Sequence, residues 1–168
     1  SIEYYKKSIA VDSSILPTYY WMGVSFETLG DHQQAIKWWN LHVQKSLEKE
    51  ATTKSTTYIR EYYDMGASLN NLERFEEAEK TFRRFLTLDS NDVYGWYGLG
   101  FSLYRQGKYD LAISAMERSI SLYPKFLEGL IIIGAILRDQ NRFSESEKYW
   151  LKVVELDSAN VNPWNEIG

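Results

Sequence analysis

Glycines recur along this chain at a fixed spacing, and that spacing limits the folds the chain can adopt. Gly66, Gly100, Gly134 and Gly168 follow one another at intervals of 34 residues, and Gly23 precedes the first of them by 43. Twelve residues after each of the first four comes a small residue, and four further on a large one: Ala35, Ala78, Ala112 and Ser146, then Trp39, Phe82, Met116 and Trp150. Several columns that agree at one period indicate an internal repeat, which has to be recognised before local structure is assigned.

Each repeat has the pattern of two helices. In the repeat around Gly100, apolar residues at i, i+3, i+4 and i+7 define one helical face. A turn signal follows, at Gly30-Asp31, Glu73-Arg74, Gly107-Lys108 and Asn141-Arg142, and a second amphipathic segment comes after it. Glycine inside a helix costs about 1 kcal/mol relative to alanine, so its recurrence predicts close packing of the two helices, with Gly100 and Ala112 at the contact.

These motifs resemble the tetratricopeptide repeat (TPR) family. The residues "WYGLG", Trp96 to Gly100, with Ala112, Met116 and Pro124, are similar to that family's W-x2-L-G…A-x3-F…P pattern. The resemblance covers nearly the whole chain. It implies an all-α fold, an α-solenoid of antiparallel helix pairs that forms a right-handed superhelix.

The repeat register predicts a single array. Its parts are the second helix of a partial repeat (residues 1–15), whole repeats at 16–49, 59–92, 93–126 and 127–160, and the start of another partial repeat (161–168). Because the chain starts at Ser1 without methionine and both ends fall inside a repeat, it is expected to be a piece of a longer protein.

Two features depart from the repeat pattern. Residues 50–58, "EATTKSTTY", are an insertion. The preferred interpretation is two helices each a turn longer, the first running from near His32 to about Ala51 and the next starting near Thr53; the alternative is a projecting elbow with its own contact surface. Bulky His42 and Phe85 stand where the family usually has a small residue, and we expect local repacking around them.

Composition excludes several function classes. The chain has no cysteine, which excludes disulfides and thiolate metal sites. A net charge of −4 with scattered Lys and Arg argues against nucleic acid as a partner. The most apolar run, Leu127 to Leu137, is too short to span a bilayer, and no signal peptide is visible, so a soluble, cytoplasmic protein is the default expectation.

No catalytic constellation is found. His32 and His42 lack the i, i+4 spacing of paired metal ligands, and "GFSLYRQGK" lacks both the glycine spacing and the Ser or Thr of a phosphate loop. The acids at the start of second helices are expected to face water near the helix dipole; they are Glu76, Glu77, Glu79, Glu145 and Glu147. We therefore expect no enzyme activity, no metal and no cofactor.

The segment from Tyr94 to Tyr104 has a second apolar face. Tyr94, Tyr97, Phe101 and Tyr104 follow an i, i+3, i+7, i+10 spacing, about 130° from the core face. Such tyrosines can fill a seam between helices, with their hydroxyls hydrogen-bonded there. A contiguous exposed aromatic patch instead marks an interaction site. Both alternatives are open from the sequence.

The TPR resemblance implies that this second face looks into a concave groove lined by the first helix of each repeat. The candidate partner-binding residues are Tyr20, Arg60, Tyr63, Tyr94, Tyr97, Phe101, Tyr104, Arg105, Ile131 and Arg138. An aromatic groove with mixed charge at its edges suits an apolar or amphipathic peptide or helix. The family's clamp for a chaperone C-terminal carboxylate is not expected, because its Lys, Asn and Arg positions hold Tyr20, Val24, Asp64, Tyr94 and Gly98.

The leading hypothesis is a non-catalytic scaffold that binds a partner in this groove. Substituting Tyr97 and Phe101 by alanine is then expected to abolish partner capture with the fold intact. The second hypothesis is a recruiting or regulatory arm of a larger enzyme or of a secretion or assembly complex. RNA binding is disfavoured by the charge, and self-association through exposed terminal helices is a further alternative.

Overall fold

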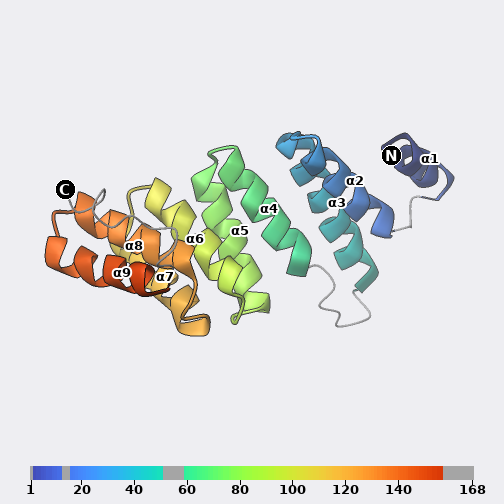
Figure 1. The fold of residues 1–168 in the computed structure, drawn as a ribbon. Coiled ribbons are helices and arrows are strands. Elements are labelled where there is room, and N and C mark those ends of the chain that lie inside the picture. The colour runs from blue at the N-terminus through green and yellow to red at the C-terminus, as the bar shows by residue number, and fades with distance from the viewer. Residues whose placement is uncertain (1, 13–15, 51–58, 157–168) are drawn as a thin grey trace. The chain divides into compact units, whose positions relative to one another are not determined.

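A computed structural model describes residues 2–12, 16–50 and 59–156, and all regular secondary structure within them is helical (Figure 1). The helices are α1 (Ile2–Val11), α2 (Leu16–Thr28), α3 (His32–Glu50), α4 (Ile59–Asn71), α5 (Phe75–Leu88), α6 (Val93–Arg105), α7 (Tyr109–Leu122), α8 (Leu127–Asp139) and α9 (Phe143–Leu156). The chain divides into two compact units, Ser1–Ser90 and Asn91–Gly168, called unit 1 and unit 2 below.

Both units are built from helix pairs joined by short turns. In unit 1, α2 packs on α3 and α4 on α5, while α3 contacts α4 and α1 contacts α2. In unit 2, α6 packs on α7 and α8 on α9, while α7 contacts α8. The predicted all-α architecture of helix pairs is therefore confirmed.

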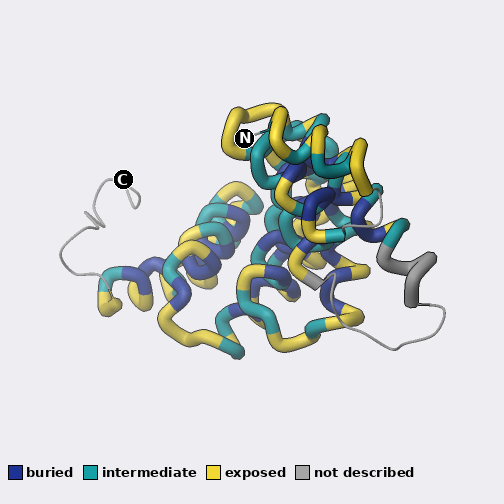
Figure 2. The backbone as a smooth tube through the Cα atoms, turned by 90° about the vertical axis from the view of Figure 1, so that its right-hand side faces the viewer, coloured by how far each residue is buried: buried dark blue, intermediate teal, exposed yellow. Residues whose placement is uncertain are grey.

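The apolar stripe of each helix forms the core of its unit. Figure 2 shows buried and exposed positions alternating along the helices, as amphipathic helices require. One core cluster in unit 1 consists of Ala35, Trp39, Val43 and Met65. In unit 2, one cluster consists of Met116, Ile133 and Leu137, and a second of Leu130, Trp150 and Val153.

The four predicted turns share one backbone conformation. Gly30, Glu73, Gly107 and Asn141 have φ angles of 75°, 57°, 73° and 59°. In each turn the following residue donates its N–H to the carbonyl five residues earlier, as Asp31 does to Phe26 at 2.9 Å, which is the hydrogen bond of a Schellman motif. The turn predictions are confirmed, and the left-handed conformation explains why two of the four positions hold glycine.

The repeated helix glycines pack against the second helix of their own pair, as predicted. A Cβ added to Gly23 would overlap the indole ring of Trp39, and one added to Gly134 would lie 2.8 Å from Nε1 of Trp150. The close partner is thus the large residue of the repeat, whereas the sequence pointed to the small one. The small residues are buried too, and the Ser146 hydroxyl donates to the Gly134 carbonyl at 2.7 Å.

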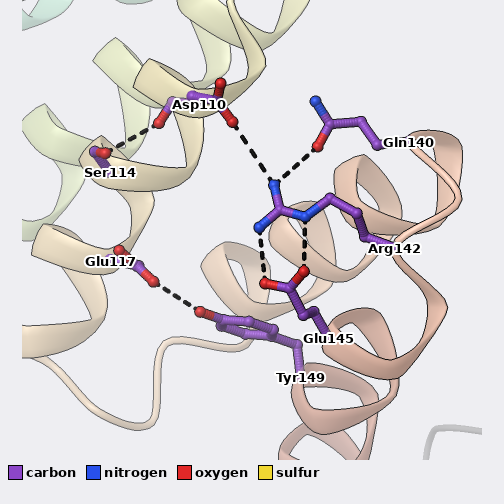
Figure 3. A network of polar contacts seen from close by, with 7 residues as sticks. All are labelled: Asp110, Ser114, Glu117, Gln140, Arg142, Glu145 and Tyr149. Atoms are coloured by element: carbon purple, nitrogen blue, oxygen red, sulfur yellow. Dashed lines mark hydrogen bonds and ion pairs between the residues drawn. The ribbon is translucent and has the colours of Figure 1, made fainter.

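An arginine at the turn ties the second helices of neighbouring repeats. Arg142 makes a bidentate ion pair with Glu145, with N–O distances of 2.8 and 2.7 Å (Figure 3). Its guanidinium also lies 3.7 Å from the carboxylate of Asp110 on α7. Nearby, the Tyr149 hydroxyl donates to Glu117 of α7 at 2.8 Å; burial and this carboxylate raise the pKa of Tyr149 to about 12. These contacts join α7 to α9 at the surface of unit 2.

Unit 1 has the same tie. Arg74 forks onto Glu77 with two N–O distances of 2.7 Å and donates to the side chain of Gln33 on α3. The side chains of Glu77 and Glu145 are 54% and 49% exposed, so these two face water as expected. The Glu79 side chain is only 14% exposed and pairs with Arg83, so the expectation is wrong there. The sequence missed the second role of Glu77 and Glu145, which is to orient an arginine that reaches the preceding repeat.

Several sequence expectations fall outside the described residues. Helix α3 extends to Glu50 and α4 begins at Ile59. The expected end near Ala51, the expected start near Thr53 and the alternative of an elbow concern residues that the structure does not describe. The same holds for the partial repeat expected at 161–168.

Candidate functional site

Unit 1 contains a hollow between α2 and α4, with Trp39 of α3 in its wall. Its volume is about 200 Å³, and its lining consists of Tyr20, Val24, Glu27, Thr28, Trp39, Arg60, Asp64 and Ala67. Two of the predicted site residues, Tyr20 and Arg60, meet here. Successive turns of α2 and α4 place these side chains on one face of each helix, in agreement with the helical spacing of the sequence.

Asp64 is the central polar group of this hollow. Its Oδ1 accepts a hydrogen bond from Nε of Arg60 at 3.2 Å, and its Oδ2 accepts a long one, 3.4 Å, from the hydroxyl of Tyr20. The Asp64 side chain is 16% exposed, whereas that of Arg60 is 71% exposed. Burial raises the pKa of Asp64, Arg60 lowers it, and Glu61 nearby raises it again; the net shift is upward. Burial and the Asp64 charge also raise the pKa of Tyr20.

Glu27 forms the second acidic part of the lining. Its Oε2 accepts a hydrogen bond from the hydroxyl of Ser68 on α4 at 2.6 Å and lies 2.8 Å from Nδ1 of His32. Ser68 is fully buried. These contacts hold the Glu27 carboxylate in place between α2 and α4.

A buried histidine–glutamate pair lies between α3 and α4. Nδ1 of His42 is 2.8 Å from Oε1 of Glu61, and the two side chains are 6% and 5% exposed. Despite this short distance, both Nδ1 of His42 and Oε2 of Glu61 are buried without a hydrogen bond. The sequence predicted only local repacking around His42. The missed signal was Glu61, which opposes it at a repeat position where the following repeats hold Gly95 and Gly129.

In unit 2 the second face of α6, formed by Tyr94, Tyr97, Phe101 and Tyr104, is only partly exposed. Tyr94 is 57% exposed and contacts the ring of Phe126 edge to face, with ring centroids 5.5 Å apart. Tyr97 contacts the same ring at 5.2 Å, and both Tyr97 and Phe101 pack against the buried cluster of α7 and α8. Burial, together with the charge of Glu128, raises the pKa of Tyr97.

Some residues of this face therefore fill the seam between helices, and others are exposed. Tyr97 and Phe101 pack within the unit and are partly exposed, and the ring of Tyr104 lies tilted against that of Tyr109 with centroids 6.1 Å apart. Tyr94 is the most exposed of the four. On α8, Ile131 is 37% exposed.

The remaining predicted site residues take part in local contacts. Tyr63 packs on the rings of Phe82 and Phe85 of α5, at 6.0 and 5.8 Å, and the guanidinium of Arg60 lies 5.5 Å from its ring centre. The guanidinium of Arg105 lies 5.8 Å from the ring of Phe101. Arg138 lies 3.5 Å from Asp139.

Comparison with known proteins agrees with the repeat pattern. Family models described as "Tetratricopeptide repeat" match residues 60–92 and 93–126. The chain contains tetratricopeptide repeats. The peroxisomal targeting signal receptor of Saccharomyces cerevisiae is 25% identical over 123 residues, which are 73% of this chain and 20% of the receptor. The chain thus spans about a fifth of the length of this curated relative.

Solved TPR structures share the fold. The crystal structure of MamA has a TM-score of 0.84 and 25% identity, covering 94% of this chain and 86% of that one. YrrB, described as a TPR protein with an unusual peptide-binding site, has a TM-score of 0.82 at 17% identity, covering 98% and 80%. At that identity the second likeness concerns the fold alone.

Within this TPR chain, both candidate surfaces lie on the first helices of their repeats. Over the described helices, none is long and apolar enough to cross a membrane. No group of three or more His, Asp and Glu side chains that could hold a metal ion occurs in the described part of the chain. The hollow in unit 1 and the α6 face in unit 2 are two candidate binding surfaces.

Replacing Asp64 by asparagine is expected to raise stability slightly at neutral pH. The pKa of Asp64 lies above its ordinary value of 3.8 in the folded chain, so the folded state favours the protonated form. That contribution is present below the ordinary pKa and is lost as pH rises through the raised one. The free energy of unfolding of the neutral variant should therefore rise relative to that of the parent as pH increases, which urea unfolding from about pH 4 to about pH 7 would measure. A variant that becomes less stable than the parent as pH increases would contradict this.

Proposed function

We propose that this TPR chain is a non-catalytic protein-interaction module that holds a peptide or helix of a partner protein against the first helices of its repeats. The observation that carries the proposal is the hollow of about 200 Å³ between α2 and α4, which combines aromatic, aliphatic and charged lining. The α6 face supports it, because Tyr94 leaves more than half of its surface uncovered. YrrB, a chain of the same fold, is described as having a peptide-binding site.

The partner surface that fits unit 2 is apolar or amphipathic. Tyr94 and Ile131 supply exposed apolar area, and aromatic residues anchor interfaces because they bury a large, rigid surface at low entropic cost. Arg60 is paired with Asp64 and Arg138 with Asp139, so part of the charge of these two arginines is balanced within the chain.

The test is the double substitution Tyr94→Ser with Ile131→Ser. Both side chains are exposed, so the helical content and melting temperature should stay close to those of the parent. Loss of two apolar anchors is expected to weaken partner capture at least about tenfold, which is about 1.4 kcal/mol or more. Affinity capture with parent and variant, followed by titration of the identified partner, measures this.

The matched control is Leu151→Ser, because Leu151 is 58% exposed and lies on α9, a second helix of its repeat, whereas the proposed surface is on first helices. Equal capture by the parent and the Tyr94/Ile131 variant would overturn the assignment of the unit 2 surface. The pair Tyr97→Ala and Phe101→Ala is a poorer probe than the sequence suggested. Both rings pack on the buried cluster of unit 2, so their loss should also cost about 2 kcal/mol of stability.

A second candidate function is recruitment of partners for a larger enzyme or assembly complex. The observation that favours it is the coverage of the curated relative, of which this chain spans 20%. In that case the Tyr94/Ile131 variant, introduced into the full gene product, should reduce the activity that depends on partner recruitment. The activity of any catalytic part measured without the partner should stay unchanged. Equal loss of the two activities would contradict this function.

A further inference from the structure

The hollow of unit 1 has the dimensions and walls to receive one long side chain. Val24, Ala67 and the ring of Tyr20 provide apolar wall, and Trp39 is 1% exposed, so this wall is held rigidly by the core. A volume of about 200 Å³ leaves room for one long side chain. Long side chains with a charged end bury their methylene groups against such walls and keep the end group at a polar partner.

The polar lining is predominantly acidic. Asp64 and Glu27 contribute two carboxylates, and Arg60 contributes one guanidinium, most of whose surface is in solvent. Oε2 of Glu27 already accepts from Ser68 and lies beside His32. Oδ2 of Asp64 has the weaker contact, a 3.4 Å bond from the Tyr20 hydroxyl, whereas hydroxyl-to-carboxylate hydrogen bonds are typically about 2.5–2.7 Å long. Asp64 therefore retains capacity for a further donor.

We propose that this hollow binds the side chain of a lysine from the partner peptide, with the methylene groups against Val24, Ala67 and Tyr20 and the ammonium group at Oδ2 of Asp64. The proposal rests on the peptide-binding function above and names the chemistry that one part of it recognises. Lysine fits better than arginine because its compact ammonium needs one free carboxylate oxygen. A planar guanidinium would need two parallel acceptors, and Oδ1 of Asp64 is engaged by Arg60.

The charge balance explains why a neutral apolar side chain is disfavoured. Filling the hollow with such a group would remove the remaining water from Asp64 without replacing its hydrogen bonds, which costs free energy. An ammonium group compensates for the lost hydration. The upward shift in the pKa of Asp64 has the same cause, because burial of this carboxylate is incompletely offset by Arg60.

The experiment uses the whole chain with labelled methyl groups, titrated with acetyl-Gly-Gly-Lys-Gly-Gly-amide at about pH 7.5. The comparison peptide carries norleucine, which has the same methylene chain and no charge. We expect the methyl signals of Val24 and Ala67 to shift with the lysine peptide and binding of the norleucine peptide to be at least fivefold weaker.

Two variants of the hollow should change the affinity in opposite directions. Asp64→Asn is expected to lower the affinity for the lysine peptide at least fivefold. This variant should stay folded, because burial of the Asp64 carboxylate costs stability in the parent. Arg60→Gln is expected to raise the affinity for the lysine peptide about threefold, since the variant removes the intramolecular cation that competes for Asp64. The matched control Asp139→Asn, on α8, should leave the affinity unchanged.

Equal binding of the lysine and norleucine peptides, or an unchanged affinity of Asp64→Asn, would overturn the lysine assignment. The two proposals can fail separately, because the Tyr94/Ile131 variant alters unit 2 and leaves the hollow intact. If partner capture depends on Tyr94 and Ile131 while the lysine peptide does not bind, the lysine proposal alone fails. If the lysine peptide binds and capture ignores Tyr94 and Ile131, the unit 2 surface alone fails.

Discussion

Replacing His42 by alanine is expected to lower the free energy of unfolding by about 3–5 kcal/mol. Nδ1 of His42 lies 2.8 Å from Oε1 of Glu61, and the Glu61 side chain is only 5% exposed. Without the imidazole, the carboxylate stays buried without its neighbour, and its Oε2 already lacks a hydrogen bond. For a chain of this size we expect the melting temperature to fall by roughly 10 °C, measured by circular dichroism.

Two further variants test the cause of this loss. The double variant His42→Ala with Glu61→Gln removes the buried charge as well, so it should be at least about 1 kcal/mol more stable than His42→Ala alone. The matched control is His32→Ala, because His32 has the same 2.8 Å distance to a glutamate, Glu27, in a more exposed place. That control should cost less than about 1 kcal/mol. Similar losses for the two histidine variants would refute the role of burial.

Replacing Gly23 by alanine is expected to destabilise the chain by about 2 kcal/mol or more. Alanine is the better helix former by about 1 kcal/mol, so propensity alone predicts a gain. Steric overlap reverses the sign, because the added Cβ would occupy the space of the Trp39 ring, which is 1% exposed and cannot move into solvent. Forcing an extra carbon into a packed core typically costs about 1–3 kcal/mol and sometimes more. Urea unfolding measures the loss.

The matched control is Gly129→Ala, another buried helix glycine. There the added Cβ would lie 3.2 Å from side-chain carbons of Ile120 and Phe126, contacts that shifts of a few tenths of an ångström relieve. We expect a change within about 0.5 kcal/mol. In the background Trp39→Leu, the cost of Gly23→Ala should also fall, since the ring is gone. An undiminished cost there would show that Trp39 is not its cause.

The repeat, the helix pairs and their turns could be predicted because their causes are local. Hydrophobic periodicity selects the face of each helix, and glycine at positions 30 and 107 suits the positive φ that each turn requires. Helical phase likewise grouped Tyr20 and Arg60 on one surface, and the structure places both in the hollow of unit 1.

The contacts that give the hollow its chemistry depend on how separate helices pack. Tyr20 reaches Asp64 across 44 residues of sequence, and Ser68 reaches Glu27 across 41. The pairing of His42 with Glu61 and the partial burial of Tyr97 and Phe101 have the same origin. By itself the sequence determined which residues share a helix face. Only the tertiary structure decided which of those faces are covered and which charges meet, because both depend on distances between helices that no local pattern encodes.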